Sequence, residues 1–136
     1  MSWRKLAAVV CVCAWVLLGG GGCKDENPAG ADSPSNIVFP ISNVSYGRQV
    51  QPLFNQACAL AGCHDDGQHQ SVLKLTSYDN VMYGGTLVVV RNKPDQSSLV
   101  LRIQGSVGPM PPNGKALNQN QINGIRAWIG EGALNN

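Results

Sequence analysis

Two cysteines and a histidine lie within seven residues of one another near the middle of the chain. Cys58 and Cys63 are separated by Ala-Leu-Ala-Gly, and His64 follows directly. Two thiols followed by an imidazole are the groups that attach haem covalently, because the thiols add to the porphyrin vinyl groups and the histidine binds the iron. The usual spacing is C-x-x-C-H, so the four-residue spacer here is longer than usual.

Two other chemistries fit the same residues. Cys58 and Cys63 can close a short disulfide loop, the expected state of paired thiols in an oxidising compartment. With His64 and His69 they also make up a Cys₂His₂ zinc set. Zinc ligands usually come as two well-separated pairs, whereas these four residues lie within twelve positions. The motif therefore favours haem over a disulfide, and a disulfide over zinc.

A methionine in a proline-rich segment offers a second ligand for the iron. Met110 lies in the sequence Gly-Pro-Met-Pro-Pro, between two predicted helices. Proline fixes φ and lowers loop entropy, which suits a thioether because this weak ligand needs a stiff support. Met82 is the competing methionine, but it lies in a predicted helix, where packing is the more usual role. His69 is too close to His64 along the chain to reach the opposite haem face.

Short helices joined by long loops must position these residues. Apolar residues at helical spacing predict a helix through 50–54, which begins or is kinked at Pro52. A second helix is expected at 78–83, after a polar cap and before two glycines. A third is expected to open at 94–97 and to continue to about 103.

The last helix is the clearest in the sequence. Asn118 is a good N-cap, and Gln121 three residues later completes a capping-box pattern. The β-branched run at 86–90 is too short to require a sheet. The sequence thus predicts an all-α, cytochrome c-like domain over residues 45–136, with three or four short helices and long loops around one covalent haem.

The first 22 residues have the pattern of an export signal. Two basic residues precede an unbroken apolar run of 13 residues, 6–18, which is shorter than the ~20 residues that a membrane-spanning helix needs. Four glycines and Cys23 follow. This segment resembles a bacterial lipoprotein signal, although Gly20 stands where that signal usually has leucine. We therefore expect a signal peptide at 1–22 and a lipid on Cys23.

Residues 23–44 are rich in Pro, Ser, Asn, Asp and Gly, and they predict a flexible tether. Within it, 37–39 are apolar and can pack back on the domain. Without the signal, the chain has eight basic and eight acidic residues, so its formal charge is zero. This balance excludes the strong basic face of a nucleic-acid binder, and we expect no nucleic-acid partner.

Several segments, taken in order, resemble the planctomycete-type cytochrome c domain, a branch of the class I cytochromes c. Besides the cysteine motif, the matching pieces lie at 50–54, 73–78, 84–85, 88–90, 94–100, 110–112, 125–129 and 132–133. The resemblance covers about residues 45–134. It implies that Cys58 and Cys63 hold one haem c through thioether bonds. His64 would then be the proximal ligand and Met110 the distal ligand. Four apolar residues would line or abut the haem pocket: Leu53, Phe54, Ile125 and Trp128.

These expectations indicate an electron carrier. With His64 and Met110 on the iron, no position is left for a substrate, and thioether ligation favours the Fe(II) state. We expect a mono-haem lipoprotein that passes single electrons between redox partner proteins in the cell envelope, on the periplasmic side of a bacterial membrane or at the cell surface. Two alternatives stay open: a haem enzyme or sensor with a displaceable sixth ligand, and a disulfide-stapled protein without haem.

Overall fold

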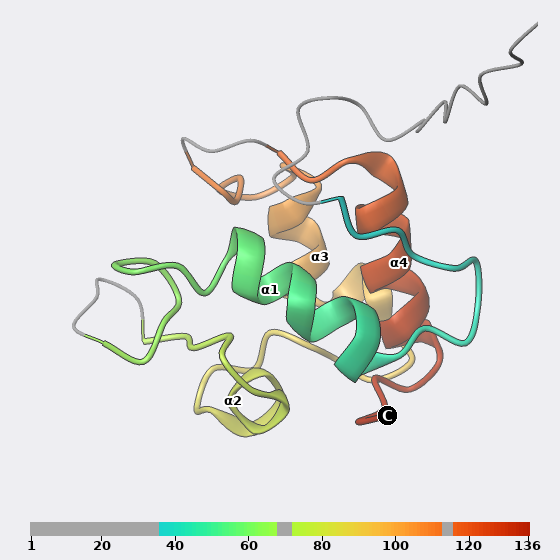
Figure 1. Cartoon of the computed structure of the whole chain (residues 1–136), viewed down its shortest axis with the longest axis horizontal. Coiled ribbons are helices and arrows are strands. Elements are labelled where there is room, and N and C mark those ends of the chain that lie inside the picture. The colour runs from blue at the N-terminus through green and yellow to red at the C-terminus, as the bar shows by residue number, and fades with distance from the viewer. Residues whose placement is uncertain (1–35, 68–71, 113–115) are drawn as a thin grey trace, which may run out of the picture.

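The computed structural model describes residues 36–67, 72–112 and 116–136. They form four short α-helices around one apolar core (Figure 1), and these ranges contain no strand. The helices are α1 (Gln51–Ala57), α2 (Tyr78–Tyr83), α3 (Ser98–Ile103) and α4 (Gln119–Gly130), with a π-helical turn η1 (Tyr46–Val50) before α1 and a 3₁₀ turn η2 (Pro94–Gln96) before α3. The predicted small all-α fold is confirmed.

Three sequence predictions fall outside the described residues. These are the signal peptide at 1–22, the lipidation site Cys23 and the candidate zinc ligand His69. No helix in the part of the chain that the structure describes is long and apolar enough to cross a lipid bilayer.

α1 continues directly from η1, and Pro52 lies in its first turn. Proline has no N–H to donate to the preceding turn, and it stands where the π-helical turn passes into α1. The turn before it is fixed by Ser45, whose Oγ accepts a hydrogen bond from the Arg48 amide (3.3 Å). The buried residues of α1 are Leu53, Phe54 and Ala57.

The predicted helix from 94 to 103 is interrupted at Ser97, which corrects the sequence interpretation. Ser97 is fully buried and extended (ψ 116°), because its hydroxyl bonds to backbone groups of the preceding loop. It accepts from the Val90 amide (2.9 Å) and donates to the Lys93 carbonyl (3.0 Å). Serine commonly competes with helical hydrogen bonding in this way. The result is η2 followed by a separate α3.

α4 begins with the predicted capping box. The Asn118 side chain accepts from the Gln121 amide (2.9 Å), and the Gln121 side chain accepts from the Asn118 amide (3.1 Å). α4 is the longest helix and contributes Ile125, Trp128 and Ile129 to the core, each with an exposed fraction of 0%. The end of the helix is held by Arg91, which donates to the carbonyls of two residues just beyond it, Gly132 and Ala133.

Residues 36–44 are packed on α4, so this part of the predicted tether belongs to the domain. We call this segment the strap. Its Phe39 is 3% exposed, and both backbone groups of Phe39 pair with the Asn120 side chain (2.8 and 3.0 Å). Gly124 makes room for the ring, because a Cβ at this position would come within 2.1 Å of Phe39.

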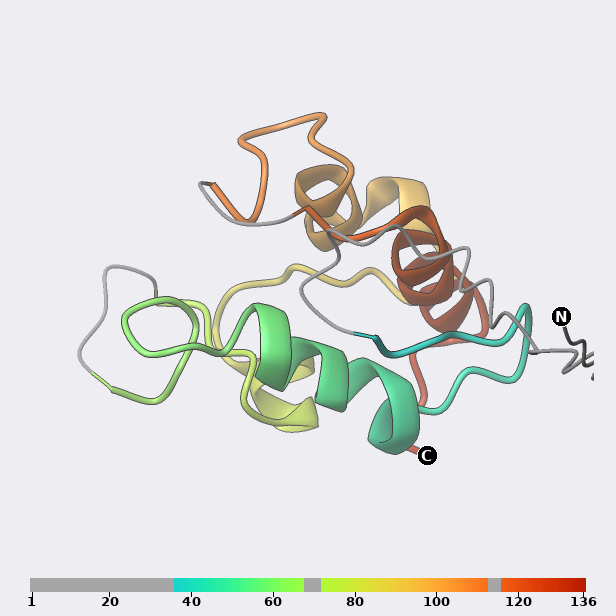
Figure 2. The ribbon, with the colours of Figure 1, turned by 45° about the horizontal axis from the view of Figure 1, so that its top comes forward.

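A second contact fixes the other end of the strap. The Glu131 carboxylate accepts hydrogen bonds from the amides of Asn43 (2.7 Å) and Val44 (2.9 Å). The strap is therefore held at both ends of α4. Figures 1 and 2 show it on the side of the molecule away from the loop that follows α1.

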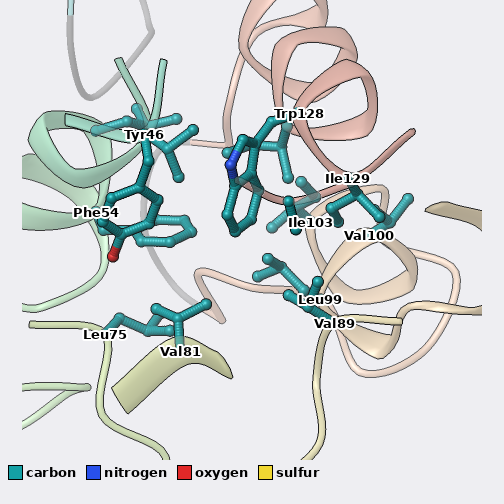
Figure 3. Packing of buried hydrophobic residues seen from close by; sticks show 14 of the residues in the cluster. Tyr46, Phe54, Leu75, Val81, Val89, Leu99, Val100, Ile103, Trp128 and Ile129 are labelled. Carbon is teal, nitrogen blue, oxygen red and sulfur yellow. The ribbon is translucent and has the colours of Figure 1, made fainter. Parts of the chain in front are cut away.

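The Trp128 ring forms the centre of the core (Figure 3). It lies between the aromatic rings of the N-terminal half, Tyr46 and Phe54, and the aliphatic side chains of α3 and α4. The ring centroids of Tyr46 and Trp128 are 5.4 Å apart, and the indole Nε1 donates to the Leu134 carbonyl (2.9 Å). Met82 of α2 is buried in the same core, as its helical position predicts.

Candidate functional site

A cavity of about 310 Å³ opens beyond the C-terminal end of α1. Its wall contains all four residues that the sequence predicts as haem attachment points and ligands. The first and last of them, Cys58 and Met110, are 52 positions apart in the chain. The lining residues are Ala57, Cys58, Gly62, Cys63, His64, Met110, Pro111, Pro112 and Leu117. The fold thus brings together two thiols, an imidazole and a thioether in one largely apolar space.

The long spacer between the cysteines is accommodated by a tight turn, which we call the spacer turn (58–63). The Cys63 amide donates to the Leu60 carbonyl (2.9 Å), and Gly62 takes a positive φ of 79° that favours glycine. The His64 amide then donates to the Cys58 carbonyl (3.2 Å), closing the loop at its base. The extra residues bulge outward, so the two cysteines and the histidine still face one cavity.

The orientation of the His64 ring is set by a backbone carbonyl. Its Nδ1 lies 2.9 Å from the Leu73 carbonyl oxygen. Because a carbonyl only accepts hydrogen bonds, Nδ1 must carry the proton, and Nε2 of the neutral ring keeps its lone pair. A hydrogen bond of this kind orients a metal-binding histidine and makes it a better donor to the metal. Leu73 was missed as a functional residue because a backbone atom has no signature in the sequence.

Met110 lies in an irregular loop, residues 105–112, which we call the methionine loop. The loop is tied to α3, since the Met110 amide donates to the Arg102 carbonyl (3.0 Å) and the Arg102 guanidinium donates to the Gly108 carbonyl (3.3 Å). Gly105 and Gly108 both have positive φ, which lets the chain fold back on α3. The thioether is therefore presented to the cavity by a supported loop.

The two cysteines are free thiols and are not joined by a disulfide. Burial, with a smaller contribution from Cys63, raises the pKa of the Cys58 thiol to about 12. A thiol with so high a pKa stays protonated at neutral pH, unlike the thiolate of a catalytic nucleophile.

The zinc alternative receives no support within the described ranges. No three His, Cys, Asp or Glu side chains in these ranges lie close enough to hold one metal ion. The fourth ligand of that alternative, His69, lies outside the described residues.

The four apolar residues expected to line or abut the haem pocket do not form the cavity wall. Leu53, Phe54, Ile125 and Trp128 are 0–1% exposed and belong to the packed core, and none of them lines the cavity. The wall is instead formed by residues next to the motifs themselves. Ala57 precedes the first cysteine, two prolines follow Met110, and Leu117 precedes the N-cap of α4. Their closeness in sequence to the motif residues was the only feature of the sequence that could have identified them as wall residues.

Comparison with known proteins gives one family match. Residues 61–114 match the model of a family described as planctomycete cytochrome C. The matched segment is less than half of the chain, and it contains Cys63, His64 and Met110 but not Cys58 or α4. No curated protein and no solved structure matches the chain. This segment is thus similar to a cytochrome c family, whose members typically bind haem covalently and transfer electrons.

Proposed function

We propose that this protein is a mono-haem c-type cytochrome that carries single electrons in the cell envelope. The observation that carries the proposal is the cavity wall, which gathers two free thiols, an imidazole with Nε2 available and a methionine thioether. This donor set fits haem c. Among the described residues, no three His, Cys, Asp or Glu side chains are grouped closely enough to hold a metal ion. The family match over 61–114 supports the same conclusion.

Each residue of the set has a distinct role in the proposal. Cys58 and Cys63 would form the thioether bonds, each by adding its S–H across one vinyl group. His64 would bind the iron through Nε2, with Leu73 holding its ring in place. Met110 would bind the iron through its thioether sulfur. When bound there, haem c supplies an iron that takes up and releases one electron.

The remaining cavity wall is suited to electron transfer and unsuited to catalysis. Among the described residues that form it there is no acidic side chain, lysine or arginine, so apart from His64 it offers no group for acid–base chemistry. The apolar alanine, leucine and proline side chains exclude water, which favours the less charged, reduced state of a haem. If His64 and Met110 both hold the iron, a substrate has no place on it.

The location of the protein follows from the sequence and is part of the proposal. A signal peptide at 1–22 and a lipid on Cys23 would place the domain on the periplasmic side of a bacterial membrane or at the cell surface. Redox proteins of the envelope would be its partners. If Cys23→Ser moves the exported protein from the membrane fraction to the soluble fraction, the anchor is supported. An unchanged distribution would contradict it.

An absorption spectrum of the exported Asp25–Asn136 fragment tests the cofactor. Production in a bacterium with haem-attachment machinery should give a red protein with sharp c-type bands on reduction. The haem should remain bound after denaturation, because it is covalent, and Cys58→Ser or Cys63→Ser should each remove one thioether bond. A colourless, folded product would overturn the proposal and favour a disulfide-stapled protein.

Two matched variants test the distal ligand. Met110→Leu should abolish the methionine–iron charge-transfer band of the oxidised protein and let carbon monoxide bind the reduced form. Met82→Leu changes the same residue type in the core and should leave both unchanged. Carbon monoxide binding to the unaltered reduced protein would instead favour the enzyme or sensor alternative.

A further inference from the structure

The strap has apolar side chains on its outer side as well as on its inner side. Residues 36–44 read Asn-Ile-Val-Phe-Pro-Ile-Ser-Asn-Val and contain no charged residue. Phe39 and Val44 are buried in the core, whereas Val38 is 61% exposed and Ile41 is 99% exposed. Pro40, between these two, is exposed as well. The strap therefore presents a short apolar surface to its surroundings, which we call the outer strap (Val38, Pro40 and Ile41).

The backbone of the strap is bonded to the protein near this surface. Both backbone groups of Phe39 pair with the Asn120 side chain, and the amides of Asn43 and Val44 donate to the Glu131 carboxylate. A backbone polar group that leaves water without a partner costs free energy. Because these groups already have partners within the protein, the strap enters an apolar environment at a lower cost than an unpaired segment would.

The charges beside the strap also suit an anionic surface. Glu131 uses both carboxylate oxygens to bind the strap amides, at 2.7 and 2.9 Å. Arg48, four residues past the strap, is an exposed cation. The strap itself contributes no carboxylate that anionic headgroups would repel, and a cation near such a membrane surface is attracted to it.

The sequence on the N-terminal side of the strap indicates what lies against it. The predicted lipid is on Cys23, and the described part of the domain begins at residue 36. The thirteen residues 23–35 can span no more than about 45 Å even when fully extended. The chain from the anchor enters the domain at the strap, so the strap is the part of the domain closest to the anchor along the chain. A weak contact beside a lipid anchor is strengthened by the high effective concentration.

We propose that the outer strap rests on the lipid bilayer that holds Cys23, with Ile41 at the boundary between headgroups and acyl chains. The inference rests on the proposed function, from which it takes the lipid on Cys23. Figures 1 and 2 show the strap on the side of the molecule away from the loop that follows α1, and this loop forms part of the cavity wall. The membrane contact thus turns the cavity away from the bilayer.

A spin label in the lipidated, haem-loaded protein tests the contact. In this form Cys23 carries the lipid and Cys58 and Cys63 hold the haem, so an introduced cysteine is the single free thiol after the signal peptide. Labelled Ile41→Cys is placed in vesicles of phosphatidylethanolamine and phosphatidylglycerol. The label should be reached by molecular oxygen, which concentrates in the bilayer, and protected from a water-soluble nickel chelate. Leu60→Cys, on the spacer turn, should show the reverse.

Equal access of the nickel chelate to the labels at positions 41 and 60 would overturn the proposal. Spin–spin broadening between labels at position 41 of two copies would show that a second copy covers the strap, and would overturn the bilayer as its occupant. High salt should leave the label at position 41 protected, because salt screens charges and not apolar contacts. Release of the label at high salt would assign the contact to Arg48 and the anionic headgroups, and would overturn the apolar contact.

Two matched replacements show whether the strap, and not the label, makes the contact. Val38→Asn, added to the labelled Ile41→Cys protein, should shift the balance between bilayer and water about tenfold toward water. Val107→Asn makes the same change in the methionine loop and should leave the balance as it was. A label that stays equally protected in both variants enters the bilayer by itself, and this result would overturn the proposal.

Failure of the membrane contact and failure of the proposed function give different results. A protein without lipid on Cys23, found in the soluble fraction, would contradict the proposed location and the membrane contact together. A membrane-bound haem protein whose label at position 41 lies in water would contradict the membrane contact alone.

Discussion

The cavity and the packed core share α1, but different kinds of contact hold them together. The core is built from helices whose side chains interdigitate around Trp128, and its edges are closed by side-chain to backbone hydrogen bonds from Asn120 and Glu131. The cavity is walled by two irregular loops, which carry its cysteines and its methionine. The core is closed by its own side chains, whereas the loops enclose a cavity of about 310 Å³.

This contrast predicts the largest effect in the core. Trp128→Ala should lower the free energy of unfolding by about 3–5 kcal/mol, because a fully buried aromatic side chain is removed. The loss should be similar with and without haem. Leu117→Ala, in the cavity wall, should lower the free energy of unfolding more in the haem-loaded protein than in a haem-free Cys58→Ala/Cys63→Ala variant. Urea titrations of both forms measure these losses. An equal loss for Leu117→Ala in the two forms would contradict the expected difference between core and cavity wall.

Two glycines of α4 sharpen the comparison within the core itself. Gly124→Ala should destabilise the protein by roughly 1–3 kcal/mol, because the new Cβ would overlap the Phe39 ring. Gly130→Ala adds the same methyl group where no other atom lies within 4 Å, so its effect should stay within about 1 kcal/mol of zero. Thermal unfolding measures both. Equal melting temperatures for the two variants would show that the strap does not depend on this contact.

In the haem-loaded protein, where Cys58 would be a thioether and not a titratable thiol, the core should also be the part that is sensitive to alkaline pH. Burial raises the pKa of Tyr46 above its ordinary range, with smaller contributions from Tyr78 and Asp79. Above pH ~10 the unfolded chain loses this proton and the folded protein keeps it, so stability falls by up to about 1.4 kcal/mol per pH unit. Tyr46→Phe should flatten the decline in urea titrations between about pH 9 and 11. If the free energy of unfolding of Tyr46→Phe falls with pH as steeply as before, a group other than Tyr46 causes the decline.

The smallest effect is expected next to the cavity wall. Asn118→Ala removes the N-cap of α4, one residue after Leu117, and should cost about 1 kcal/mol. Asn118→Ser retains an oxygen for the Gln121 amide and should be nearly neutral. Chemical denaturation resolves the two variants. A larger loss in the serine variant than in the alanine variant would show that the side chain acts other than as a cap.

Local rules predicted most elements of the fold. The capping box of α4, the Ser77 cap and Gly84 end of α2, and the acceptance of Pro52 in the first turn of α1 all depend on residues adjacent in sequence. The break at Ser97 could not be predicted, because its hydroxyl bonds to a carbonyl and an amide of a loop several residues earlier. The docking of the strap depends on contacts more than eighty residues apart along the chain.

The candidate site also has residues that the sequence predicted and residues that it could not predict. Cys58, Cys63, His64 and Met110 carry their chemistry in their side chains, so residue type and spacing predicted them, and the structure places all four around one cavity. The lining residues could not be assigned correctly. Apolar residues at helical spacing have the same pattern whether they face a core or a cavity. Only the tertiary packing, which buries Phe54 in the core and leaves Ala57 in the cavity wall, separates the two.

The strap also determines how a mechanical load would enter the domain. Tension applied through the chain before residue 36 meets the Phe39–Asn120 pair first and the bonds of Glu131 next, both on α4. The spacer turn and the methionine loop come later along the chain, behind η1 and α1. A pull on the N-terminal side therefore reaches the longest helix before it reaches the loops that form the walls of the cavity.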